Sequence, residues 1–121
     1  MQTRTVKLSW TAAADGSVAA IPMSLANYNF LKGYGYLLYA MTTNPGSTAP
    51  TDNYDIVIED ADGTDVLGGA GANRDAANTE TVQPLINGLP APYPMDGALT
   101  VKISGNSVNA ATGTITLIFV G

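Results

Sequence analysis

The sequence predicts an all-β fold: a single-domain antiparallel β-sandwich or jelly-roll-like barrel of about seven or eight short strands with long loops. Three observations predict it. Apolar and polar residues alternate in several short segments, as in strands that bury one face. Turn-forming Gly, Pro, Asn and Asp residues separate these segments. The one segment with helix signals, residues 24–33, has only weak helical periodicity.

The N-terminal part of the chain predicts a strand, a turn and a second strand. Alternation over residues 5–10 predicts the first strand, and Asp15-Gly16 supplies the positive φ angles of a tight hairpin turn. Residues 17–21 read as the returning strand, which we expect Pro22 to end. Residues 24–33 are expected to form one short helical turn at most.

The middle of the chain contains one strand that is apolar on both faces. Residues 34–43 have this pattern, which indicates a central strand or a contact between subunits. Residues 44–52 read as a loop, and residues 54–59 alternate as a strand that ends in a turn at 60–63. Residues 68–78 lack any core-forming pattern and predict a long surface loop whose ordering requires a neighbour.

The C-terminal part predicts three more strands. The first runs over residues 80–86 and precedes a connector with prolines at 90, 92 and 94. Residues 99–104 alternate between apolar and polar side chains. Residues 112–120 alternate too, but Ile118 and Val120 add apolar side chains to the second face. We therefore expect the last strand to be central in a sheet or at an interface.

Composition excludes several classes of function. The 121 residues are of ordinary size for one domain, 1–121, in which residues 1–5 are an expected N-terminal arm. Only 12% are charged, and the five basic residues form no stripe that could follow a phosphate backbone, so nucleic-acid binding is not expected. No apolar run reaches membrane-spanning length. A surface with so few ions loses water readily on contact with protein.

The sequence also predicts that the protein is not an enzyme and carries no cofactor or metal. It has no Cys and no His, so the usual catalytic triads and thiolate or imidazole metal sites cannot form. A carboxylate pair of the glycosidase type stays open as an alternative. Residues 60–65 resemble a calcium loop but lack its Gly and Glu positions, and residues 68–71 lack the Lys of a phosphate loop.

Acidic and aromatic residues each allow two interpretations. Six of the ten acids lie between residues 52 and 65, where a solvated strand and turn is favoured over a patch for a basic partner. The six tyrosines and Trp10 could form a sugar-binding platform. Core or interface packing is favoured, because Tyr34, Tyr36 and Tyr39 lie within one predicted strand. With few charges to guard the sheet edges, a cyclic oligomer is the expected way to close them.

Several segments together resemble a known family. These are the opening strand 3–8 with its Asp15-Gly16 turn, the strand 54–60 followed by 62–67, and the closing strands 97–104 and 112–117. The pattern is similar to that of the small β-sandwich virion structural proteins of tailed bacteriophages, of the capsid decoration or cement type. The resemblance spans most of the chain and lies in its strand pattern.

The resemblance implies a role, a partner and a place. It implies a homotrimer that binds the lattice of the phage major capsid protein on the capsid exterior, stabilises the head, and is made in the host bacterial cytoplasm. A tail, neck or head-fibre component is the second structural interpretation. A carbohydrate- or receptor-binding module is the competing one.

The candidate interface residues come from exposed loops, the N-terminal arm and the tyrosine-rich strand. They are Arg4, Tyr34, Tyr36, Tyr39, Asn73, Arg74 and Tyr93. We expect replacement of Arg74 by Ala to lower occupancy on virus particles and to leave the isolated fold intact.

Overall fold

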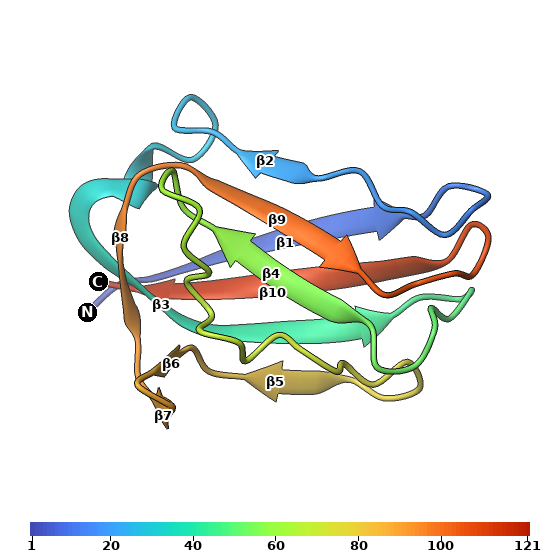
Figure 1. The fold of residues 1–121 in the computed structure, drawn as a ribbon. Helices are drawn as coiled ribbons and strands as arrows, with labels where there is room; N and C mark the ends of the chain where they lie inside the picture. Colours follow the sequence, from blue (N-terminus) through green and yellow to red (C-terminus); the bar gives the residue numbers. More distant parts are fainter.

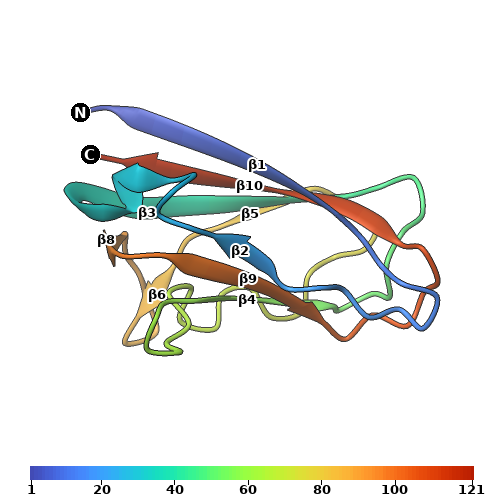
Figure 2. The same cartoon turned by 90° about the horizontal axis from the view of Figure 1, so that it is seen from above.

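The computed structural model describes residues 1–121 and is an antiparallel β-sandwich with two layers (Figures 1 and 2). Its ten strands confirm the all-β prediction and exceed the expected number, because the Pro-rich region is divided into several short strands. In chain order they are β1 (Thr3–Thr11), β2 (Ile21–Met23), β3 (Lys32–Pro45), β4 (Asp55–Glu59), β5 (Glu80–Val82), β6 (Leu85–Ile86), β7 (Leu89–Pro90), β8 (Tyr93–Asp96), β9 (Leu99–Ser104) and β10 (Thr112–Val120).

The larger sheet has five strands and contains both ends of the chain. Its order is β1-β10-β3-β5, and β8 also pairs with β3, beside β5 on the same edge. Strand β10 lies between β1 and β3, which confirms its predicted central place. Strand β3 is central as well, and its register with β10 shifts between Ile118 and Phe119. This bulge leaves Ala40 outside the core cluster that contains Leu38 and Met41.

The smaller sheet has the order β2-β9-β4 and packs against the larger one (Figure 2). The predicted hairpin between β1 and residues 17–21 is wrong. The turn at Asp15-Gly16 exists, but the chain then crosses to the other layer, where β2 pairs with β9. Pro22 does not end that strand but lies inside it, which is tolerated because β2 is an edge strand.

The structure also shows what residues 24–33 and residues 1–5 form. The only helical element within residues 24–33 is η1 (Asn29–Leu31), a 3-10 turn, as expected, and β3 begins at Lys32. Residues 1–5 do not form a free arm, because β1 begins at Thr3 and Gln2 exchanges backbone hydrogen bonds with Gly121. The structure contains no helix with the length and apolar character needed to cross a membrane.

The core lies between the two sheets and forms one cluster of 23 buried residues. Inward-facing positions of β1, β4, β9 and β10 alternate with outward-facing ones, as the sequence pattern predicts. Aromatic rings join the layers: the centroids of Phe30 and Phe119 are 5.1 Å apart in an edge-to-face arrangement, and those of Trp10 and Tyr54 are 5.9 Å apart.

Burial of Tyr54 makes the stability of the fold sensitive to alkaline pH. Its side chain is almost fully buried, and burial raises the pKa of its phenol above the usual 10.0. The unfolded chain therefore loses this proton at a lower pH than the folded one, so stability is complete below about pH 10 and falls above it. We expect urea unfolding of the Tyr54→Phe variant to show a shallower loss of stability between neutral and alkaline pH. An equal slope in both proteins would contradict this assignment.

Candidate docking surfaces

The seven predicted interface residues do not form one surface. Among the tyrosines, Tyr34 and Tyr39 are exposed, with 69% and 45% of their area accessible. Tyr36 is buried in the core with its ring edge-on to Phe30, and Tyr93 is half-buried against the same core. Tyr34 and Tyr39 are thus available to a partner, whereas Tyr36 is mainly a core residue.

Arg4 lies at the edge of the larger sheet, next to an aromatic cluster. Its guanidinium carbon is 5.2 Å from the centroid of Phe30 and 5.6 Å from that of Tyr36. Its Nε donates a hydrogen bond to the Tyr36 hydroxyl, 3.3 Å away, and that hydroxyl donates to Oε1 of Gln2. No carboxylate pairs with Arg4. The stacked rings hold this cation in place and leave its charge available.

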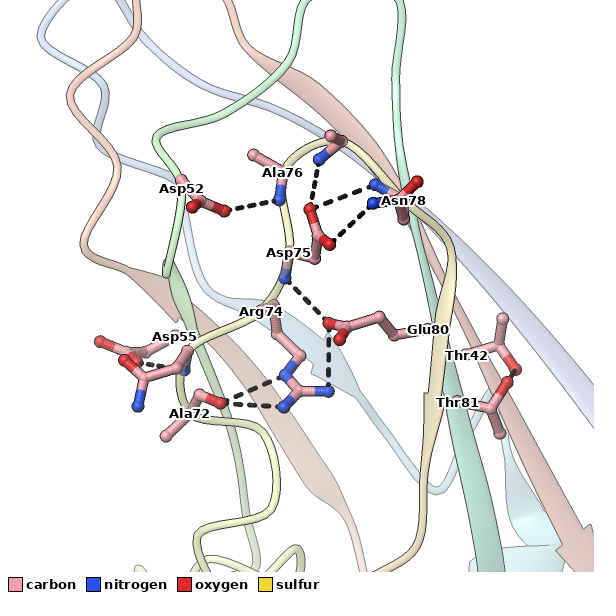
Figure 3. Close-up of polar contacts among 12 residues, drawn as sticks. Thr42, Asp52, Asp55, Ala72, Arg74, Asp75, Ala76, Asn78, Glu80 and Thr81 are labelled. Atoms are coloured by element: carbon pink, nitrogen blue, oxygen red, sulfur yellow. Dashed lines mark hydrogen bonds and ion pairs between the residues drawn. The ribbon is translucent and has the colours of Figure 1, made fainter.

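Arg74 is used within the chain, as Figure 3 shows. Its Nε and Nη2 donate to the carbonyl of Ala72, and its Nη1 lies 3.4 Å from Oε1 of Glu80. Only 13% of its side chain is exposed. Its interface role stays a prediction, but removal of its side chain would also break internal contacts. An Arg74→Ala variant is therefore not the clean interface probe that the sequence suggested.

The long loop orders itself, so the expectation that it requires a neighbour is wrong. The peptide N–H of Asn73 donates to Oδ1 of Asp55, and that of Ala76 donates to Oδ1 of Asp52 (Figure 3). Asp75 accepts bonds from Asn78 and Ala77, and these bonds lower the pKa of its carboxyl. The carboxylates replace a neighbouring subunit as acceptors for the loop's backbone.

These bonds also explain the acidic segment. Asp60 and Asp65 accept hydrogen bonds from backbone N–H groups of the turn and loop that follow β4. No group of three or more acidic side chains has the arrangement of a metal site. The observed role of the acids agrees with the favoured interpretation, in which they belong to a strand and its turn.

A surface that the sequence analysis missed is the β6–β7 hairpin, at the lower left of Figure 1. Ile86 and Leu89 face each other across its two strands and are 38% and 70% exposed. Asn87 and Gly88 connect them with φ angles of 53° and 78°, as in a two-residue hairpin turn. The Asn-Gly pair between apolar residues was a usable sequence signal, hidden by the surrounding prolines.

The chain has only remote similarity to known proteins. No protein-family model matches it, and no curated protein does. A chain in the capsid asymmetric unit of cyanophage Pam1 is similar, with 11% identity and a TM-score of 0.46, over 98% of this chain and 82% of that one. A chain in the acidic stable capsid structure of Helicobacter pylori bacteriophage KHP30 has 10% identity and a TM-score of 0.35, over 98% and 92%. Both similarities are remote.

Exposed tyrosines do not assemble into a sugar platform. Three surface hollows are present, and neither Tyr34 nor Tyr39 lines any of them. Tyr28 and Tyr36 line the largest one, beside the N-terminal half of β1, and Tyr93 lines a separate one. The two most exposed tyrosines therefore do not add to a concave patch of the kind that a carbohydrate site requires, although Tyr28, Phe30 and Tyr36 share the largest hollow.

Proposed function

We propose that this chain is a capsid decoration protein of a tailed bacteriophage, which binds the major capsid lattice as a homotrimer and stabilises the head. The resemblance in strand pattern supports the choice of a virion. A rigid sandwich that presents a projecting apolar element is suited to docking on other protein subunits. Many identical contacts on a repeating lattice add up even when each is weak.

The observation that carries the proposal is the exposed β6–β7 hairpin. Residues 83–92, which contain it, include no charged side chain, so little desolvation opposes its burial. Three prolines and the tight turn restrict its backbone before any partner binds, which lowers the entropy cost of docking. Leu89 has 70% of its area in water, and a complementary pocket would bury it.

Replacing Leu89 by Asp should reduce occupancy on particles. Full burial of a Leu side chain is worth about 1.5–3 kcal/mol, and a tenfold change in affinity corresponds to about 1.4 kcal/mol. We therefore expect at least a tenfold weaker binding to particles that lack the protein, with an unchanged unfolding midpoint. Quantitative gel analysis of sedimented particles measures the number of bound copies per particle.

The matched control introduces the same charge at the opposite end of the sandwich. The turn after β1 lies far from the β6–β7 hairpin (Figure 1), and Ala14 is exposed in that turn. The Ala14→Asp variant should bind as the original protein does. Equal occupancy of the Leu89→Asp protein would remove the hairpin from the interface. A copy number of only a few to dozens per particle would favour a tail, neck or fibre part. A monomer at high micromolar concentration in light scattering would contradict the trimer.

A further inference from the structure

The outer edge of β1 is an unpaired nine-residue strand edge. Gln2 and Gly121 exchange hydrogen bonds, and Ala12 donates to Ala111, so the even-numbered residues of β1 bond to β10. The N–H and C=O groups of the odd-numbered residues consequently point away from β10. They belong to Thr3, Thr5, Lys7, Ser9 and Thr11, and none of them has a backbone or side-chain partner elsewhere in the protein.

The opposite situation holds at β4, the outer strand of the smaller sheet. The chain itself provides hydrogen-bond partners for the outward-facing backbone groups of β4. Ile56 N–H donates to the carbonyl of Gly71, Ile58 N–H donates to the Asp65 carboxylate, and Ile58 C=O accepts from Val66 N–H. The protein thus closes the β4 edge with its own loop and leaves the β1 edge open. Open edges of this length are a template for another strand.

A groove runs beside the N-terminal half of β1. It has a volume of about 620 Å³ and is lined by residues 2–6 of the strand, by residues 27–30 and by Tyr36. The rings of Tyr28 and Phe30 form part of its wall, and Arg4 lies over Phe30. A strand added to β1 would direct alternate side chains into this groove, since side chains of neighbouring strands share a face of the sheet.

The charges along β1 indicate which kind of strand would bind to its open edge. Arg4 and Lys7 project on opposite faces of β1, and neither forms an ion pair. The groove lining contains no acidic residue, and the first acid in the chain is Asp15. Although the whole chain has a formal charge of −5, this edge is therefore positive. It is complementary to an extended segment that carries carboxylates.

We propose that the β1 edge binds an extended acidic segment of a partner protein, which adds to the larger sheet as a sixth strand. One carboxylate of the segment pairs with Arg4 in the groove, and another, three residues away, pairs with Lys7 on the opposite face. Backbone hydrogen bonds provide much of the affinity, and the two cations select the acidic sequence.

A second copy of β1 fits this edge less well. In the antiparallel pairing that centres on Lys7, the two ammonium groups lie directly opposite each other, and like charges across a strand pair are destabilising. Shifting the register by one hydrogen-bonded pair places the two lysines diagonally, still within reach. Arg4 would also be left without a carboxylate in either arrangement, because residues 3–11 contain none.

A proline substitution tests the edge and leaves the fold in place. Thr5→Pro removes an outward N–H that no group of the protein accepts, and edge strands tolerate proline in that orientation. The probe is a labelled nonapeptide of alternating Thr and Val with Glu at the two positions that oppose Arg4 and Lys7. Its matched control has Gln at both positions. Binding is followed by fluorescence anisotropy, and the contacts by amide NMR shifts of the full chain.

We expect the Glu peptide to bind at least tenfold more tightly than the Gln peptide at low salt and to slow amide exchange at Thr5, Lys7 and Ser9. Thr5→Pro should abolish binding, and the Arg4→Gln, Lys7→Gln double variant should bind both peptides equally. Equal affinity of the two peptides for the original protein, shifts outside β1, or unchanged binding by Thr5→Pro would overturn the proposal. If the amide NMR shifts of β1 changed with the concentration of this protein in the absence of peptide, a second copy of the chain would be favoured as the partner. The inference is independent of particle occupancy, so its failure and that of the decoration role can be told apart.

Discussion

Replacement of Asp65 by Ala is expected to destabilise the fold by about 3 kcal/mol, because three N–H groups, two of them in partly buried hydrogen bonds, lose one shared acceptor. Oδ1 of Asp65 accepts from Ile58 and Leu67 at 3.1 and 3.0 Å, and Oδ2 accepts from Gly69 at 2.9 Å. The carboxylate thus joins β4 to the loop that follows it. Urea unfolding followed by Trp10 fluorescence measures the loss.

Asp62→Ala is the matched control for this variant. Asp62 is exposed in the turn just before Asp65, and its carboxylate accepts no hydrogen bond from the protein. We expect the control to change stability by less than about 0.5 kcal/mol, as is usual for such surface substitutions. If the two variants were equally stable, Asp65 would not be the residue that holds the loop on β4.

Replacement of Gly71 by Ala should have an effect of similar size for a steric reason. A Cβ at this position would lie 2.1 Å from the carbonyl oxygen of Ile56 and 2.9 Å from Cδ1 of Leu67. The first contact is with backbone of β4, so it can be relieved only by moving the loop away from the strand. That movement also breaks the hydrogen bond from Ile56 N–H to Gly71. A loss of at least about 2 kcal/mol is expected from overpacking of this kind.

The control is the same substitution two residues earlier. Gly69 has a φ of +90°, but a Cβ there would meet no atom within 4 Å. The Gly69→Ala variant therefore carries only backbone strain, of about 1–2 kcal/mol. Thermal unfolding should rank Gly71→Ala below Gly69→Ala, and the reverse order would show that backbone conformation dominates over the clash.

The Asp65→Ala and Gly71→Ala variants should also aggregate more readily than the original protein. When the loop leaves β4, the outward groups of Ile56 and Ile58 lose their partners and form a second open edge. That edge carries apolar side chains and is prone to pairing with other chains. Aggregation of the Asp65→Ala and Gly71→Ala proteins, in contrast to their controls, would follow from the same opening. Recognition through β1 alone depends on β4 staying closed.

The interface residues show how far the sequence could be interpreted. Arg4 and Arg74 are both cations that the sequence suggested as interface residues. In the fold, Arg74 forms an ion pair with Glu80 and a hydrogen bond to the carbonyl of Ala72. Arg4 contacts only aromatic rings and a tyrosine hydroxyl. Only one of them is free to meet an external carboxylate. The aromatic neighbours of Arg4 are distant in sequence, so no local pattern could reveal them, whereas Ala72 and Glu80 are close to Arg74 in the chain.

Local alternation by itself determined the strands β1, β4, β9 and β10 and their buried faces, because a two-residue period has a direct meaning in an extended chain. The absence of Cys and His likewise determined that no thiolate or imidazole of this chain can act in a site. The tertiary structure alone decided that β2 joins the second sheet, that the acidic residues hold the loop on β4, and that the edge of β1 stays open. These features depend on which strands meet across the molecule, and pairing partners are selected by the packing of the whole core rather than by any one segment.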